Sequence, residues 1–498
     1  MKKLIYIACM ASGIFLNTSC VDLNQEPLSF PSEEGYFSDL DKIQKAATGL
    51  STSMWASNYG FNCRMQILGI GADDITYSPT KANNRYAYFE NLSPEIDINK
   101  DDVTIMWDLC LTVINNANSM IEKVQIPSDE KVKTKYEEVL GEAYFMRGLA
   151  YFYLVRFYGD VPLLLKISDA ETRMPRTSVE DIYAKAIVPS LEQAISWLPE
   201  KSRSKTSSTP SKSAAKACLT DVYMTMAGWP LKKGKEYYAK AAEVANDIIT
   251  NATKNGLSLT KNYQDLWMEA KKKDTNEHLF ALHHSSAYKV ASNYGKSYYP
   301  KDFYPNAGWA DYYAEEQFYL SYPDGARKDW NFMTEWESGN KDNHKVISYK
   351  ESIDKLPAIS KYYNYDEGAA GKSAQANGIT SIYRYADVLL MYAEASTRAT
   401  GSVNTLAAKC LKDVQERAKS SVITNTTNPE VFLKAVFDEN GWEFFAEMRR
   451  WFDLVRLEKV SEVNKHWDNS LFKGNNHYYM PIPESQILLT GWTNNAGY

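Results

Sequence analysis

Apolar side chains recur every three or four residues through most of the first half of the sequence, and this spacing constrains the fold more than any other feature. It places those side chains on one face of an α-helix, the face that packs against a neighbour. Comparable runs cover residues 106–120, 187–198, 215–226 and 237–248. The clearest run consists of Val139, Ala143, Met146, Ala150, Tyr153 and Phe157. Helices are therefore predicted to dominate to about residue 250, and the expected fold class is mainly α.

Helix boundaries in this half carry the usual signals. Ser178 precedes a predicted helix and Asp181 follows three residues later, which is a variant of the capping box. Gly159 and Pro162 end the long helix before it, since proline cannot extend a helix. Consecutive amphipathic helices joined by short turns indicate stacked pairs, as in tetratricopeptide arrays. Their spacing is too irregular for a strict 34-residue repeat, so we predict a degenerate array of helical pairs.

The pattern changes from about residue 256 to residue 380, where Gly, Pro, Asn, Tyr and Trp follow one another with little sustained periodicity. A loop-rich stretch of this length inside a folded chain is generally functional. Helical spacing returns at 385–395 and again near 442–455. We therefore expect an N-terminal helical-repeat region over 20–255 and a C-terminal region over 256–498, whose loop-rich part 256–380 lies across one face of the helices.

The N-terminus resembles a bacterial lipoprotein signal. Two lysines open it, an apolar run of 13 residues from Leu4 to Leu16 follows, and Thr18 and Ser19 precede Cys20. We predict that residues 1–19 are a signal peptide and that the thiol of Cys20 is acylated. Acylation would tether the protein to a membrane, because each buried methylene of the lipid contributes roughly 0.8 kcal/mol. Ordinary secretion and an uncleaved anchor are the alternatives.

Net charge and cysteine content narrow the classes of protein to which this chain can belong. The formal net charge is −6 and the sequence has no long run of Lys or Arg, so nucleic acid is not an expected partner. Beyond residue 20 the cysteines are scattered and contain no C-x-x-C pair, which argues against a zinc site or a disulfide framework. One long-range disulfide stays open among Cys63, Cys110, Cys218 and Cys410.

Catalytic motifs are hard to find in this chain. Asp73 and Asp74 are adjacent, and a turn or polar contact explains them better than an acid/base couple. His283 and His284 lack a third ligand at metal-binding spacing, and surface or packing roles fit them better. There is also no H-E-x-x-H, no G-x-S-x-G and no complete dinucleotide fingerprint. We therefore predict a protein that is not an enzyme and that needs no cofactor, with a structural calcium left open.

Binding has better support, because the chain holds 35 tyrosines and 12 tryptophans. Sugars offer C–H faces that stack on aromatic rings and hydroxyls that bond polar side chains. Two stretches mix both residue types, 73–89 and 288–313.

Several segments along the chain resemble the SusD/RagB family of surface nutrient-binding lipoproteins, and their order matches too. Cys20 with Asp22-Leu23-Asn24 and Pro27 is similar to the family's start, and the ending Asn494–Tyr498 is similar to its terminus. The most diagnostic segments are GEAYFMRGLAYFYLVRFYGDVPL from residue 141, RYADVLLMYAEA from residue 384, EFFAEMRRWFDLVR from residue 443 and YMPIP from residue 479.

Most charges in those segments lie among apolar and aromatic neighbours, where an unpaired charge would be costly. We expect them to form structural ion pairs rather than ligand contacts. They are Glu142, Arg147, Arg156, Asp160, Arg384, Asp387, Glu394, Glu443, Glu447, Arg449, Arg450, Asp453 and Arg456.

The resemblance implies a cell-surface receptor, lipid-anchored at Cys20 on the outer face of a Gram-negative outer membrane. It would bind an oligosaccharide and deliver it to a SusC-like TonB-dependent transporter, its expected partner in glycan uptake and polysaccharide utilisation. The resemblance also implies that ligand contacts come from the two aromatic stretches, where the candidates are Tyr77, Asn84, Arg85, Tyr294, Tyr298 and Trp309. The alternatives are a surface glycoside hydrolase and a peptide-binding or scaffold protein of the same fold.

Overall fold

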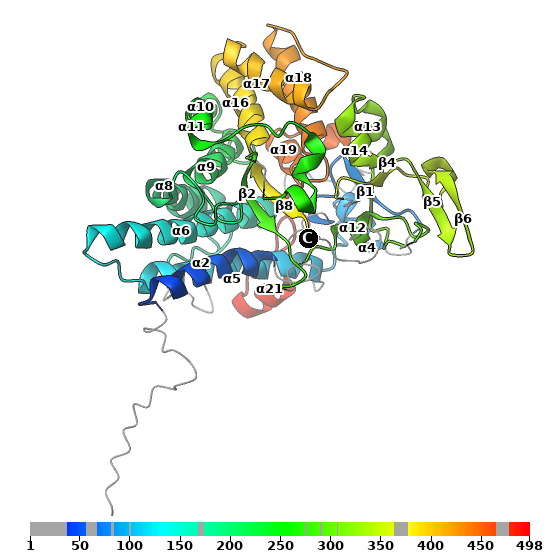
Figure 1. The fold of residues 1–498 in the computed structure, drawn as a ribbon. Helices are drawn as coiled ribbons and strands as arrows, with labels where there is room; N and C mark the ends of the chain where they lie inside the picture. The colour runs from blue at the N-terminus through cyan, green and yellow to red at the C-terminus, as the bar shows by residue number, and fades with distance from the viewer. Residues whose placement is uncertain are drawn as a thin grey trace, which may run out of the picture.

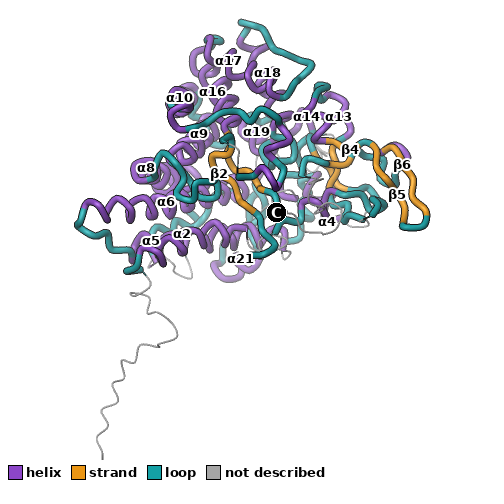
Figure 2. Tube along the Cα trace, in the orientation of Figure 1, coloured by secondary structure: helices purple, strands orange, loops and turns teal. Residues whose placement is uncertain are grey.

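The computed structural model describes residues 37–55, 67–80, 84–98, 101–167, 174–273, 276–288, 291–305, 307–362, 377–464 and 478–498. The predicted signal peptide, Cys20 and Cys63 lie outside these ranges. Most of the described elements are α-helices, which confirms the predicted fold class (Figure 2).

The N-terminal helices form a continuous array, as predicted. In this array α5 packs on α6, α6 on α8, α8 on α9 and α9 on α10. Each of the apolar runs found in the sequence lies on one of these helices or on the π-helical turn before α8. The elements are α2 (Leu40–Trp55), α5 (Asp101–Lys123), α6 (Glu130–Tyr158), α7 (Val179–Ile182), the π-helical turn Tyr183–Ile187, α8 (Val188–Trp197), α9 (Lys212–Ala227), α10 (Lys235–Thr250) and α11 (Ala252–Asn255).

The helix-boundary signals are confirmed. The Ser178 side chain accepts a hydrogen bond from the backbone N–H of Asp181 at the start of α7. Gly159 caps the end of α6 at a φ of 71°, a conformation that glycine adopts without steric cost. Its N–H donates to the carbonyl of Val155, which satisfies one of the free acceptors of the last turn.

The array continues with helices from the C-terminal half. Helix α16 (Tyr385–Thr400) packs on α10, and α17 (Thr405–Arg417) and α18 (Pro429–Glu443) pack on α16, so these four lie in succession in Figure 1. The segment between α11 and α16 is thus an insertion between neighbouring members of one array. The chain then forms α19 (Arg450–Arg456), α20 (Val460–Val463) and α21 (Glu484–Thr490).

The inserted segment holds more regular structure than the sequence predicted. Its short helices are α12 (Tyr294–Tyr298), α13 (Glu316–Ser321) and α14 (Ala326–Asn331), and α4 (Asn84–Glu90) lies beside it. Its strands form antiparallel two-stranded ribbons, one of them with a strand from the N-terminal half. In that ribbon β3 (Tyr312–Ala314) pairs with β1 (Ile75–Tyr77). The ribbons within the insertion are β2 (His278–His283) with β8 (Ile379–Arg384), β4 (Phe332–Met333) with β7 (Ala358–Ile359), and β5 (Glu335–Asn340) with β6 (Asn343–Ser348).

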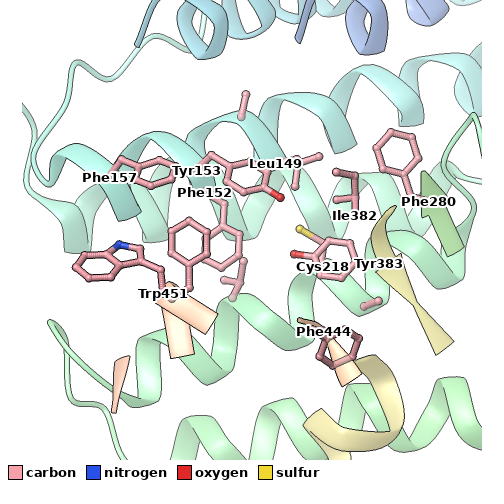
Figure 3. Packing of buried hydrophobic residues seen from close by; sticks show 14 of the residues in the cluster. Leu149, Phe152, Tyr153, Phe157, Cys218, Phe280, Ile382, Tyr383, Phe444 and Trp451 are labelled. Carbon is pink, nitrogen blue, oxygen red and sulfur yellow. The ribbon is translucent and has the colours of Figure 1, made fainter. Parts of the chain in front are cut away.

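Helix α6 runs through the main hydrophobic core. Figure 3 shows Leu149, Phe152, Tyr153 and Phe157 extending from it among aromatic side chains of the C-terminal half. The ring of Phe157 lies 5.1 Å from that of Phe452, centroid to centroid, which is typical of packed aromatic pairs. Both halves of the chain therefore share one core.

A cluster of buried charges ties the C-terminal helices to the inserted segment. Arg384 is fully buried and its guanidinium lies 2.7 Å from a carboxylate oxygen of each of Glu277, Glu443 and Glu447. We call the following set the buried charge cluster: Glu277, Arg327, Lys361, Arg384, Arg417, Glu439, Glu443 and Glu447. Its cations and anions are equal in number, which offsets much of the desolvation cost.

The expectation of structural ion pairs is confirmed beyond this cluster as well. Arg456 pairs with Glu394 at 2.6 Å, and Arg449 pairs with Asp387 at 2.9 Å. Arg147 and Asp160 are the exceptions, and the Arg147 guanidinium donates to the neutral side chains of Asn118 and Ser190. The other predicted partners form the pairs Glu142–Arg203, Arg156–Asp221, Arg450–Asp73 and Arg456–Asp453, while Asp160 accepts from the N–H of Val179.

Candidate functional site

The β1–β3 ribbon joins the two aromatic stretches that the sequence singled out. Ile75 pairs with Ala314 and Tyr77 pairs with Tyr312, so residues near position 75 lie beside residues near position 312. The backbone N–H of Glu315 also donates to the carbonyl of Asp74 at 3.0 Å. Two segments separated by more than two hundred residues thus meet in one place, as the site prediction requires.

Aromatic side chains gather at the Tyr77 end of this ribbon. The rings of Tyr77 and Tyr86 stack at 5.9 Å with an interplanar angle of 17°, and Tyr86 meets the edge of Tyr312 at 5.7 Å. The Tyr86 hydroxyl donates to Asp311 at 3.2 Å. Burial, and then the Asp311 carboxylate, raise the pKa of Tyr86 to about 12, so its hydroxyl stays protonated. We call Tyr77, Arg85, Tyr86, Asp311 and Tyr312 the tyrosine junction.

Arg85 supplies the positive charge of the tyrosine junction. Its Nε lies 2.9 Å from Oδ2 of Asp102, a fully buried carboxylate in the first turn of α5, and its guanidinium carbon lies 5.0 Å from the centre of the Tyr86 ring. The side chain is nevertheless 37% exposed. The ion pair with Asp102 therefore fixes the position of this partly exposed guanidinium, which also donates to the Tyr86 hydroxyl at 3.4 Å.

The other predicted contact residues have different positions. Tyr294 and Tyr298 are only 2% and 0% exposed, and both rings stack in parallel with that of Tyr362. In this conformation they support the loops from inside and offer no ring face to a ligand. Trp309 is half-buried on the approach to β3, and its backbone N–H donates to the carbonyl of Lys296. Asn84 opens α4, and its side chain lies outside the described structure.

Asp73 and Asp74, the adjacent pair considered as an acid/base couple, have structural partners. Asp73 accepts two hydrogen bonds from Arg450, at 2.6 and 2.9 Å. Asp74 is buried and accepts from the backbone N–H of Ala446. Burial, and then the charge of Asp73, raise the pKa of Asp74 to about 6. This arrangement agrees with the polar-contact interpretation of the pair.

The adjacent histidines also have packing roles. His283 shares a hydrogen bond with Ser207 at 2.9 Å, and the buried His284 shares one with Thr380 at 2.7 Å. His283 ends strand β2, so its prediction as a loop residue is wrong. The apolar residues before it are buried on both faces of the strand, and such a run has no polar alternation to reveal it. Within the described ranges, no three His, Cys, Asp or Glu side chains are arranged to hold a metal ion.

A cleft of about 760 Å³ lies beyond the other end of the β1–β3 ribbon. Asp73 lines it just before β1, Phe318 lines it just after β3, and the remaining walls come mainly from α18, α19 and α20. Its volume is in the range of small-molecule sites, roughly 300–1,000 Å³. This cleft has no contiguous signal in the sequence, since its walls come from segments that only the folded chain brings together.

Known families match both parts of the chain. Residues 50–224 match a family model described as "Starch-binding associating with outer membrane", and residues 333–498 match the model of the SusD family. The chain belongs to the SusD/RagB family. Within the family it is 25% identical to SusD-like protein P2 of Formosa agariphila over 507 aligned positions, covering 96% of this chain and 97% of that protein.

Solved structures agree with this assignment. A SusD superfamily protein from Parabacteroides distasonis superposes with a TM-score of 0.78 at 25% identity, covering 92% of this chain and 98% of that one. A laminarin-binding SusD-like protein superposes with a TM-score of 0.72 at 20% identity, covering 93% of this SusD/RagB chain and 100% of its own, and at that identity it supports the fold alone.

Two further findings concern the membrane and the cysteines. Among the helices in the described ranges, none is both long enough and apolar enough to cross a bilayer. Buried free thiols occur at Cys110, Cys218 and Cys410. Burial raises the pKa of both the Cys218 and the Cys410 thiol to about 12, which keeps them protonated and unreactive.

Proposed function

We propose that this SusD/RagB-family protein is a cell-surface receptor that binds oligosaccharides and passes them to a TonB-dependent transporter in the outer membrane. The observation that carries the binding proposal is the geometry of the tyrosine junction. The partly exposed ring of Tyr77 stacks on Tyr86, the Arg85 guanidinium lies 5.0 Å from the Tyr86 ring, and the β1–β3 pairing brings Tyr312 alongside Tyr77. Tyr77, Arg85 and Tyr86 come from the first of the two stretches that mix aromatic and polar residues, and Asp311 and Tyr312 come from the second.

The tyrosine junction offers the two contacts that a sugar needs. The half-buried Tyr77 ring can lie against a patch of sugar C–H groups, because Tyr86 behind it fixes its plane. Arg85 can donate to ring or hydroxyl oxygens, and Asp311 can accept from a hydroxyl. Among the residues predicted from sequence, Tyr77, Arg85 and Trp309 are the accessible candidates, while Tyr294 and Tyr298 hold the loops in place.

Membrane attachment and delivery have support from the sequence. A lipoprotein-type signal precedes Cys20, and the description of the matching N-terminal family model includes association with the outer membrane. We propose that Cys20 is acylated and that its lipid holds the protein on the outer face of the outer membrane. The test is metabolic labelling with a palmitate analogue: the native chain should carry the label, and Cys20→Ala should lose both the label and membrane association. Equal labelling of the two would refute the anchor.

The binding proposal is tested by titration calorimetry with maltohexaose and laminarihexaose. Tyr77→Ala should weaken the affinity about two- to tenfold, since a stacking contact is worth roughly 0.5–1.5 kcal/mol. Tyr237→Ala is the matched control, because Tyr237 is a half-buried tyrosine on α10, far along the array, and should leave affinity unchanged. Unaltered affinity in Tyr77→Ala would exclude the junction as the site. Release of reducing ends during the titration would instead indicate a glycoside hydrolase.

A further inference from the structure

The cleft beside α18 is a separate feature from the tyrosine junction. The two lie beyond opposite ends of the β1–β3 ribbon, with Tyr77 and Tyr312 paired at one end and Ile75 and Ala314 at the other. A smaller pocket of about 230 Å³ adjoins the cleft and shares Asp73, Phe318, Ser321 and Val463 with it. We call the larger of the two the α18 cleft; Asp73, Phe318, Phe437, Trp442 and Arg450 line it.

Aromatic rings in the α18 cleft are fixed by the packing behind them. Phe318 stacks on Phe445 at 5.7 Å and 20°. Trp442 lies 6.2 Å from Tyr322, whose hydroxyl donates to the Trp442 carbonyl. The indole N–H of Trp442 has no acceptor in the described part of the chain. The cleft therefore combines a preorganised aromatic wall with a hydrogen-bond donor that a ligand can satisfy.

A rigid pair of hydrogen-bonding groups lies beside these rings. Arg450 binds both carboxylate oxygens of Asp73, donates to the carbonyl of Phe437 at 3.1 Å, and stacks its guanidinium 4.1 Å from the Phe437 ring. A guanidinium has five N–H groups and a carboxylate has about four acceptor positions. After this pairing Arg450 can therefore still donate a hydrogen bond and Asp73 can still accept one. Together they can donate to one hydroxyl and accept from its neighbour.

The charges of the cleft are balanced. Its described lining has four cationic side chains, Arg398, Lys434, Arg450 and Lys459, and four anionic ones, Asp73, Glu430, Asp438 and Glu462. Most are paired locally, as in Lys434 with Asp438 at 2.5 Å and Lys459 with Glu462 at 2.7 Å. An ionic ligand would gain attraction from one set of charges and lose it to the other, whereas an uncharged ligand can bond to both.

We propose that the α18 cleft is a second saccharide-binding site, specific for a neutral oligosaccharide. This inference rests on the proposed function, since it assigns a second subsite to the same class of ligand. The aromatic wall receives the C–H face of a sugar ring, and the Arg450–Asp73 pair receives vicinal hydroxyls. A peptide would also present polar and apolar groups, but its termini and charged side chains would compete with the paired charges of the lining.

The experiment counts binding sites on the full chain by calorimetry with laminarihexaose and maltohexaose. Ser321→Trp fills the cleft from an exposed position and gives up only the hydrogen bond that the Ser321 hydroxyl donates to the Phe318 carbonyl, and Trp442→Ala removes part of the aromatic wall. The wild-type chain should bind two equivalents, and each variant should lose one of them or weaken it at least tenfold. Tyr77→Ala should weaken the other equivalent and leave the cleft unchanged.

Each outcome separates this inference from the proposed function. If the wild-type chain binds a single equivalent of saccharide, and Tyr77→Ala loses that binding while Ser321→Trp retains it, the cleft proposal alone is overturned. If the wild-type chain binds a single equivalent, and Ser321→Trp loses that binding while Tyr77→Ala retains it, the cleft is supported as a saccharide site and the tyrosine junction is excluded as one. Labelling with 5-fluorotryptophan adds a local readout, since the Trp442 resonance, assigned by its absence in Trp442→Ala, should shift with saccharide. A shift with casein peptides and none with either hexaose would also overturn the proposal.

Discussion

Neutralising Glu443 should destabilise the protein more than almost any other single charge change. This carboxylate is fully buried at the end of α18 and accepts hydrogen bonds from Arg327, Arg384 and Arg417 at 2.5–2.7 Å. In Glu443→Gln the shape is retained, but the amide offers one acceptor oxygen and turns its NH₂ group toward a guanidinium. The buried charge cluster would then carry one uncompensated positive charge.

The magnitude follows from the charge states of the cluster. Burial alone would raise the pKa of Glu443, but Arg417, Arg384 and Arg327 lower it from 4.5 to about 2. A depression of that size corresponds to about 3 kcal/mol of stability. Breaking a buried pair by removing one partner costs roughly 3–5 kcal/mol, in the same range. The contribution is fully present above pH 4.5 and is lost as the pH falls toward 2, because protonation then occurs in the folded state too.

Urea unfolding followed by tryptophan fluorescence at pH 7 measures this effect. Lys409→Gln is the matched control, because it removes an exposed pair with Asp413 on α17 and should cost at most about 0.5 kcal/mol. Glu443→Gln should lower the unfolding midpoint clearly more than the control, and the difference should shrink as the pH approaches 2. Equal midpoints for the two variants at pH 7 would refute the idea that this cluster holds the C-terminal helices together.

Three further results are expected. Gly228→Ala should lower the free energy of unfolding in urea by about 2 kcal/mol or more, since the new Cβ would lie 2.2 Å from the Arg456 carbonyl oxygen. Gly49→Ala in α2 is the control: a Cβ there has nothing within 4 Å and should raise the stability by roughly 0.5–1 kcal/mol. A Gly228→Ala variant more stable than Gly49→Ala would contradict the packing. Glu394→Gln should flatten the pH dependence of stability between 4.5 and 2, because paired arginines outweigh burial and lower the pKa of Glu394 to about 2; an unchanged acid-unfolding profile would argue against that pairing. Iodoacetamide should alkylate the buried thiols of Cys110, Cys218 and Cys410 only after unfolding, as peptide mass mapping can show. Rapid labelling of the native protein would show that these thiols are accessible.

The helical part of the fold was predictable because its signals are local. The apolar spacing from Val139 to Phe157 specifies a helix whatever that helix packs against, and Ser178 and Gly159 mark ends through short-range hydrogen bonds. Strand β2 was missed because a short strand buried on both faces has no alternation. The partners of the charge cluster were equally hidden, since Arg384 reaches Glu277 and Glu443 only through the tertiary fold.

The candidate site was predictable by region and not by residue. Composition drew attention to the stretches around Tyr77 and Trp309, and β1–β3 pairing brings those stretches together. The burial of Tyr294 and Tyr298 could not be inferred, because a tyrosine has the same composition signal whether its ring faces a ligand or another ring. The α18 cleft has no contiguous sequence signal at all.

The ion pair between Asp73 and Arg450 spans 377 positions of the chain. Contacts that close so long a loop form late, because the entropy of closure must be offset before they contribute. The ribbon that carries the tyrosine junction starts beside Asp73, so this contact ties the start of β1 to a helix near the end of the chain. A chain cut short before α19 would lack Arg450 as well as the Phe452 ring that packs on α6, so the start of β1 and the core beneath it would lose support from the same missing segment.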